Sequence, residues 1–282
     1  MIRLRQLFPY LIAPLLLLAA AIFAPQIAPC DPYAQDLGMA LRAPDGAHLL
    51  GTDRYGRDVL SRVILGAQTT ICTSLLLVTA VAAIGCLIGA LAGLRGGRTG
   101  ALLMRIADSF LAFPEMVFAI AAAGALGGGL VHAALALALI GWPKYARLAR
   151  SLVMPLRSQP YIEAARMNGT GTCGMLWHHV LPNMAGPVIV TAVLDIGSTI
   201  MQLAGLSFLG LGAQPPLAEW GAMMNSGRSM LQAAPWTILA PGGAIFFTVS
   251  AFNILGDALR DWLDPKQATQ KHSKQKQMEE AT

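Results

Sequence analysis

The stretch 185–209 contains one ionisable side chain, that of Asp195, among apolar and small residues. If the stretch spans a membrane, an ionised carboxylate near its centre costs about 2.5–3.5 kcal/mol unless it faces water or a partner group. Helical spacing puts further polar side chains on the same face as Asp195. These belong to Thr191, Ser198, Thr199 and Gln202. The stripe predicts a polar lining that can bind a solute. The alternative is a hydrogen bond that fixes only the packing of two helices.

A weaker candidate for the same lining is Asn253, which lies four residues before Asp257 in the last apolar stretch. Catalysis inside a membrane would need a serine beside a base, two facing aspartates or a His-Glu-x-x-His metal motif. Only Asp195 is plainly central, so the residues for such chemistry are missing. The Gly-x-x-x-x-Gly-Lys-Ser/Thr phosphate loop is also missing. We therefore expect no catalytic residue, no nucleotide site and no bound cofactor in this chain.

The cysteines and histidines do not form a recognisable metal motif. The four cysteines are Cys30, Cys72, Cys86 and Cys173. No two of them have the spacing of a zinc finger or a redox pair. His132 is predicted near the outer membrane surface, where His48 is the other histidine, and the thirteen methionines have no repeated spacing. The sequence therefore predicts no metal site.

The segment 51–62 combines acidic and basic side chains. Its charged residues are Asp53, Arg54, Arg57, Asp58 and Arg62. Spacings of three to four residues between them predict a charged helix on the outer surface of the membrane. Such a helix could receive a soluble partner or brace the outer ends of the spans, and the residues favour neither role. The candidate residues of this segment are Gly51, Thr52, Asp53, Gly56, Arg57 and Asp58.

The segment 149–184 is too long for a simple connection and too short for a catalytic domain. It predicts a short helix, a tight turn at Gly169 and a second helix broken near Pro182. Two adjacent alanines in the first helix leave a smooth patch that another protein can approach closely. The hairpin is therefore predicted to take up motion from a soluble partner. Its candidate residues are Glu163, Ala164, Ala165, Gly169, Leu181 and Pro182.

The elements that must hold these segments are membrane-spanning helices. Apolar residues make up 55% of the chain and charged residues 12%, whereas a soluble domain carries about a quarter charged residues. The formal charge of +5 is scattered between uncharged runs, which argues against a nucleic-acid partner. Six largely apolar stretches can cross roughly 30 Å of lipid hydrocarbon as helices. They are 6–30, 69–94, the two parts of 105–144 on either side of Gly127-Gly128-Gly129, 185–209 and 235–255. We expect an all-α integral membrane protein with six transmembrane helices.

Lys and Arg are unevenly distributed between the two sides of these spans. If the N-terminus is cytoplasmic, fifteen of the twenty Lys and Arg residues lie inside, and the positive-inside rule then places both termini in the cytoplasm. The basic start also fits a cleaved secretory signal. Because the apolar run is long, contains Pro14 and Pro25 and lacks a small-residue cleavage site, we expect an uncleaved first helix.

Glu163-Ala164-Ala165, followed by Gly169 and Leu181-Pro182, resembles the signature loop of permease subunits in ATP-binding-cassette (ABC) importers. Further motifs similar to the peptide and nickel branch of this family lie at 51–62, 208–212, 215–216, 219–221 and 256–261. The resemblance covers about residues 45–265 and implies the type I (MetI-like) permease fold. The implied division is an N-terminal helix in 1–30, an extracytoplasmic segment in 31–67, the permease core in 68–258 around the loop 149–184, and a cytoplasmic tail in 259–282.

The resemblance also implies partners and a cargo. The partners are a second homologous permease subunit, two cytoplasmic ATPase subunits that use ATP and Mg²⁺, and an extracytoplasmic substrate-binding protein, all at the cytoplasmic (inner) membrane of a bacterium. Leu203 stands where peptide-type subunits often carry a glutamate, and 250–253 also resembles nickel-type subunits. Nickel or a metal chelate is therefore expected ahead of di- and oligopeptides. A transporter driven by an ion gradient is a remote alternative, since it would not need the hairpin.

Overall fold

The computed structural model describes residues 2–263, so the part of the predicted tail from residue 264 onward lies outside the described residues. Within this range the regular elements are helices, apart from one antiparallel bridge between Thr52 and Asp58. In chain order the α-helices are α1 (Ile2–Ile22), α2 (Ala24–Ile27), α3 (Val59–Arg95), α4 (Gly97–Leu111), α5 (Glu115–Ala125), α6 (Leu130–Leu156), α7 (Pro160–Met167), α8 (Thr172–Met175), α9 (Leu181–Phe208), α10 (Trp220–Gly227) and α11 (Trp236–Leu263). The short elements are η1 (Leu37–Met39), η2 (Leu176–Val180) and η3 (Arg228–Met230).

Three helices of the described chain are long and apolar enough to cross a membrane: α3, α11 and the continuous helix Thr172–Phe208, which joins α8 to α9. A fourth crossing results if α4 and α5 act as one span, bent by 87° at the break between them. The apolar part of α1, Leu7–Ile22, is shorter, and α6 carries Lys144, Arg147 and Arg150 in its second half. Helices thus occupy all six predicted stretches, while the number of crossings stays a prediction.

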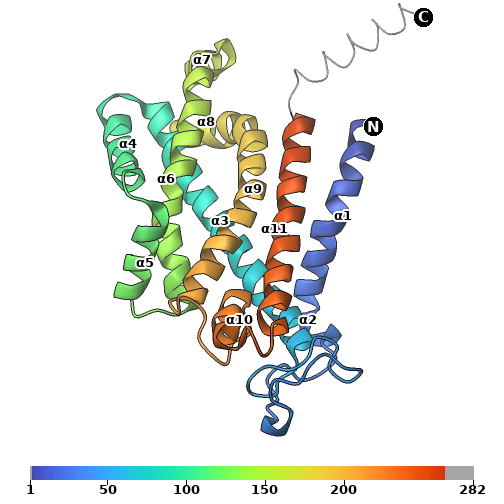
Figure 1. Cartoon of the computed structure of the whole chain (residues 1–282). Helices are drawn as coiled ribbons and strands as arrows, with labels where there is room; N and C mark the ends of the chain where they lie inside the picture. The colour runs from blue at the N-terminus through green and yellow to red at the C-terminus, as the bar shows by residue number, and fades with distance from the viewer. Residues whose placement is uncertain (1, 264–282) are drawn as a thin grey trace, which may run out of the picture.

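The two ends of the described chain lie at the same end of the bundle. Figure 1 shows the start of α1 and the end of α11 at the end where α7 and α8 lie, with α10 and the loop before α3 at the opposite end. This arrangement is the one that the predicted orientation requires. Which end faces the cytoplasm stays a prediction.

α3 and α6 approach each other closely because α3 presents a row of glycines. Gly85, Gly89 and Gly93 are four residues apart and therefore lie on one face of α3. A Cβ added to Gly89 would lie 2.0 Å from the carbonyl oxygen of Ala146, and one added to Gly85 would lie 2.4 Å from that of Trp142. Small residues allow such backbone contact between membrane helices. The resulting pair forms a frame against which α9 packs.

The core of this frame extends into the end of the bundle that holds α7. Ile162 of α7 and Leu176 and Val180 of η2 are buried in the same cluster as Leu94 of α3 and Val153 of α6. Burying these side chains removes apolar surface from water at the end of the bundle. The short helix α7 is therefore fixed to the long helices rather than loosely attached.

Candidate functional site

A cavity of about 150 Å³ lies among residues of α3, α5, α6 and α9. Its polar lining consists of Glu115, Lys144, Tyr145, Asp195, Ser198, Thr199 and Gln202. Its remaining lining consists of Leu77, Val78, Val81, Leu137 and Gly141. Four of the six residues predicted to line a solute pathway therefore surround one cavity, because α9 turns a single polar face toward it.

Asp195 forms an ion pair with Lys144 of α6. The hydroxyl of Ser198 lies 3.0 Å from the backbone oxygen of Asp195 and 3.3 Å from its carboxylate Oδ1. The side chain of Asp195 is 15% exposed and that of Lys144 is 54% exposed, so the pair lies at the wall of the cavity rather than within the packed core. The cavity thus presents one positive and one negative group side by side.

Thr191 and Asn253, the other two predicted lining residues, lie outside this cavity. The hydroxyl of Thr191 donates to the backbone oxygen of Pro187 at 2.9 Å, within its own helix. Asn253 lies where α11 packs on α9, since a Cβ added to Gly197 would lie 3.1 Å from its Oδ1. The spacing placed Thr191 on the polar face of α9 but could not show that the cavity stops at Asp195, one turn short of Thr191.

The turn after α7 has the geometry that glycine at this position favours. Gly169 has a φ of +79°, and its N–H donates to the oxygen of Arg166 at 3.1 Å. The N–H of Thr170 donates to the oxygen of Ala165, also at 3.1 Å. These two bonds form a Schellman motif, which satisfies carbonyl groups at the end of a helix. The predicted tight turn at Gly169 is therefore present.

The second arm of the hairpin differs from the prediction. It is not broken near Pro182, because α8, η2 and α9 form one continuous helix. Pro182 lacks the N–H that an α-helix would need, and η2 accommodates it as a single π-helical turn in which the N–H of Leu181 bonds to the oxygen of Leu176. The first arm also differs, since α6 continues to Leu156 and so takes up the start of the predicted loop 149–184.

The hairpin exposes several large apolar side chains. Met167 of α7 is 89% exposed and Trp177 of η2 is 60% exposed, and Glu163 and Ala164 of α7 are also exposed. Ile162, on the opposite face of α7, is fully buried. Large exposed apolar side chains can mark a surface that binds another protein. Leu181 is partly buried and Pro182 is exposed, both at the start of α9.

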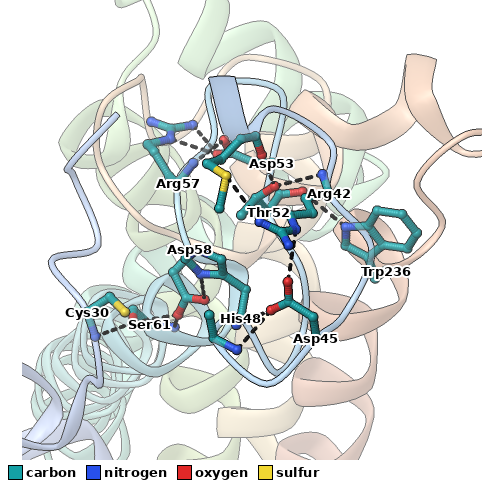
Figure 2. A network of polar contacts seen from close by, with 12 residues as sticks. Cys30, Arg42, Asp45, His48, Thr52, Asp53, Arg57, Asp58, Ser61 and Trp236 are labelled. Atoms are coloured by element: carbon teal, nitrogen blue, oxygen red, sulfur yellow. Dashed lines mark hydrogen bonds and ion pairs between the residues drawn. The ribbon is translucent and has the colours of Figure 1, made fainter. Parts of the chain in front are cut away.

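The segment 51–58 is a folded loop, and the prediction of a charged helix over 51–62 is wrong. The helix α3 begins only at Val59, after Asp58 has accepted a hydrogen bond from the N–H of Ser61 as its N-cap. The carboxylate of Asp53 accepts a bond from Arg57 Nε at 2.7 Å (Figure 2). It also accepts one from the N–H of Tyr55 at 2.8 Å. The charges spaced three to four residues apart therefore close a turn instead of facing solvent along a helix.

The small residues of this loop are required by its close contacts. Gly51 and Gly56 have φ values of +69° and +71°, and a Cβ on Gly56 would lie 1.7 Å from the oxygen of Asp36. Thr52 is fully buried, and its backbone oxygen accepts a bond from Trp236 Nε1 of α11 at 3.0 Å. All six candidate residues of the segment thus lie in one compact loop held against α11. Whether it also receives a soluble partner stays a prediction.

Two arrangements were not predicted from the sequence. Glu219 is fully buried and caps α10, accepting bonds from the N–H groups of Gly221 at 3.0 Å and Ala222 at 2.8 Å. Burial raises the pKa of Glu219, although these donors oppose the shift. In the loop 28–58, which precedes α3, the backbone N–H of His48 donates to the carboxylate of Asp45. This bond lowers the pKa of the Asp45 carboxyl.

The second unpredicted arrangement is a group of three side chains at the start of α3. One potential ligand atom from each of Cys30, His48 and Asp58 lies within 4.8 Å of the other two. The residues are far apart in the sequence, and only folding of the loop brings them together. No spacing rule for short metal motifs could have found them.

Comparison with known proteins identifies the family. Residues 85–269 match the family described as binding-protein-dependent transport system inner membrane component. The chain is 45% identical over 251 residues to the probable D,D-dipeptide transport system permease protein DdpC of Escherichia coli (strain K12), covering 89% of this chain and 84% of that protein. It is 44% identical over 253 residues to the glutathione transport system permease protein GsiD of Escherichia coli O6:K15:H31 (strain 536 / UPEC), covering 89% and 84%. It is 41% identical over 242 residues to the nickel transport system permease protein NikC of Escherichia coli (strain K12), covering 86% and 87%.

These matches confirm the resemblance that the motifs indicated. The matched family consists of transport components rather than enzymes, and they need no bound cofactor of their own. Dependence on a binding protein and on ATP hydrolysis implies an external binding protein and ATPase subunits as partners. The chain belongs to the family of binding-protein-dependent transport system inner membrane components, as a multi-pass permease of the ABC importers whose members include peptide, glutathione and nickel permeases.

Proposed function

We propose that this chain forms half of the translocation pathway for small zwitterionic solutes, above all di- and tripeptides, together with a second homologous permease subunit. The observation that carries the proposal is the Lys144–Asp195 pair at the wall of the cavity. A short peptide bears one ammonium and one carboxylate group, so each can replace one half of the pair. Ser198, Thr199 and Gln202 supply neutral donors and acceptors beside it.

Nickel, carried as the ion or as a chelate, is the second candidate, and the sequence alone placed it first. The relative named for nickel transport is 41% identical, against 45% for the relative named for D,D-dipeptide transport, which favours peptides only slightly. A bare nickel ion is well bound by imidazole, or by a square of nitrogen and oxygen ligands. The cavity offers instead two carboxylates, Glu115 and Asp195, next to a lysine. A chelate that brings its own ligands needs only the charges that also suit a peptide.

The hairpin of α7 is proposed to receive an ATPase subunit on the cytoplasmic side, with one such subunit on each of two permeases. Exposed Glu163, Ala164 and Met167 on one face of α7, with Ile162 buried on the other, support this role. ATP and Mg²⁺ would bind the ATPases alone. Motion of the hairpin would reach the cavity through the continuous helix Thr172–Phe208, and the loop 51–58 would face the binding protein.

The charge pair can be tested by transport assays on the reconstituted importer. We expect Asp195→Asn to lower uptake about tenfold or more, because a hydrogen bond to a charged group contributes about 1.5–3 kcal/mol. Thr191→Val, which alters a side chain outside the cavity, is the matched control. Exchanging the two charges, with Lys144→Asp and Asp195→Lys in one chain, separates packing from binding. Full recovery of uptake in the exchanged protein would show that the pair only holds α6 to α9.

Substrate class and energy source are tested in the same vesicles. Labelled dipeptide and labelled nickel are offered separately, each with the matching binding protein. We expect ATP-dependent uptake of the dipeptide. Uptake that continues with a hydrolysis-deficient ATPase and follows an ion gradient would replace the importer with a secondary transporter. Uptake of nickel alone would retain the permease role and change the cargo.

A further inference from the structure

In the loop 28–58, a thiol, an imidazole and a carboxylate lie close together. Cys30 follows α2, His48 lies in the loop, and Asp58 is the N-cap of α3. The imidazole Nδ1 of His48 lies 2.9 Å from Oδ1 of Asp58, and one atom of each of the three side chains lies within 4.8 Å of the others. Figure 2 shows the three side chains around the start of α3, with Ser61 beside Cys30 and Asp58.

The surroundings hold these groups in place. Ser61 donates from its N–H and from its hydroxyl to Oδ2 of Asp58, at 2.8 and 2.6 Å. The same hydroxyl accepts a bond from the N–H of Cys30 at 3.0 Å, so one serine orients two of the three residues. His48 is fixed by its N–H, which donates to Asp45 at 2.7 Å. Hydrogen bonds of this kind around metal ligands set their orientation and support affinity.

The electrostatics also leave room for a cation. The side chain of Asp58 is 3% exposed, and within the described part of the chain it pairs with His48. A divalent ion bound by one thiolate, one carboxylate and one neutral imidazole gives a site of zero net charge. The ion would also give the buried carboxylate of Asp58 a full counter-charge.

From these contacts we propose that Cys30, His48 and Asp58 form a binding site for a divalent transition-metal ion of the Zn²⁺ class on the extracytoplasmic side of this permease. Thiolate and imidazole are poor ligands for Mg²⁺ and Ca²⁺ but suit Zn²⁺. Zinc lies about 2.0–2.3 Å from such ligands in a tetrahedral site, so the side chains need to move by about 1 Å. The thiol proton is released to solvent on binding, and water completes the fourth position.

The ion would tie three separated parts of the chain to one another. Cys30 ends the segment that leaves α1 and α2, whereas Asp58 begins α3, and His48 lies in the loop between them. An ion held by all three would fix the loop against the start of α3. The proposal concerns this loop alone and does not depend on which solute crosses the cavity.

The test is metal binding by the full-length chain, purified without a polyhistidine tag and kept reduced with a phosphine. We expect one Zn²⁺ per chain by elemental analysis, and Co²⁺ in its place should give the thiolate-to-cobalt charge-transfer absorption. Cys30→Ser should abolish that absorption, and Cys30→Ser and His48→Gln should each weaken Zn²⁺ binding at least tenfold. Both replaced side chains are partly exposed, so these variants should fold.

Matched controls separate this site from other thiols and imidazoles. Cys72→Ser removes an exposed cysteine of α3, and His178→Gln with His179→Gln removes two adjacent histidines from the opposite end of the molecule. Both controls should bind Zn²⁺ as the parent does. The proposal is overturned if the parent binds no Zn²⁺, if Cys30→Ser binds it with unchanged affinity, or if the controls lose binding as much as the site variants do.

Discussion

At the scale of single residues, Gly56 is the position in the loop 28–58 where an added side chain would have the least room. Its φ is +71° and a Cβ there would lie 1.7 Å from the oxygen of Asp36. A left-handed conformation costs a residue with a Cβ about 1–2 kcal/mol, and the overlap with backbone adds to this. We expect Gly56→Ala to lower the thermal unfolding midpoint of the purified protein. Gly46→Ala, with no atom within 4 Å of the new Cβ, is the control, and equal midpoints for the two variants would contradict the argument.

Single residues could be predicted where their signal was local. Gly169 ends a helix in a Schellman turn, and a glycine after a short helix is enough to indicate this. Asp195 could be singled out as a carboxylate that needs a partner, but Lys144 is on another helix, so no pattern along α9 could name it. The same limit applies to Cys30, His48 and Asp58, which meet only in the folded loop.

At the scale of elements, the glycine row of α3 sets how closely α6 can pack. Gly89→Ala would place a Cβ 2.0 Å from the oxygen of Ala146, and because backbone cannot yield there, the helices must separate. Overpacking of this kind costs about 1–3 kcal/mol. We expect lower thermal stability in detergent and loss of uptake. Gly243→Ala, in the interior of α11 with nothing within 4 Å, should instead be neutral or slightly stabilising.

If Gly89→Ala and Gly243→Ala unfold at the same temperature, α3 and α6 do not depend on backbone contact. The row could have been read from Gly85, Gly89 and Gly93, because small residues four apart indicate a helix contact.

The presence of helices was predicted well from composition, whereas the points where they begin and end, which polar contacts decide, were predicted poorly. The apolar stretches all proved helical. The segment 51–62 has the charge spacing of a helix, but its acidic groups bond to nearby N–H groups, with Asp53 closing a turn and Asp58 capping α3. Acidic residues before a helix favour such caps over helix interiors. At Pro182 a break in the helix was predicted, but a π-helical turn keeps the helix continuous.

At the scale of the whole molecule, α7 is joined to the cavity through packed side chains and one long helix. Ile162 is fully buried in the cluster that contains Val180, and the helix Thr172–Phe208 runs from there to Asp195. Replacing a buried isoleucine by alanine costs about 2–5 kcal/mol of packing. We expect Ile162→Ala to loosen α7, so that ATP hydrolysis continues in the assembled importer but less solute enters per ATP.

Met167→Ala is the matched control, because Met167 is 89% exposed on the same helix and contributes little to the core. If the exposed face of α7 receives the ATPase, this variant should weaken copurification of the ATPase and leave the uptake per ATP unchanged. The two variants therefore separate attachment of the partner from transmission of its motion. Measuring uptake and hydrolysis together in vesicles of known composition gives the ratio directly. An unchanged ratio in Ile162→Ala, with normal assembly, would mean that motion reaches the cavity by a route other than α7.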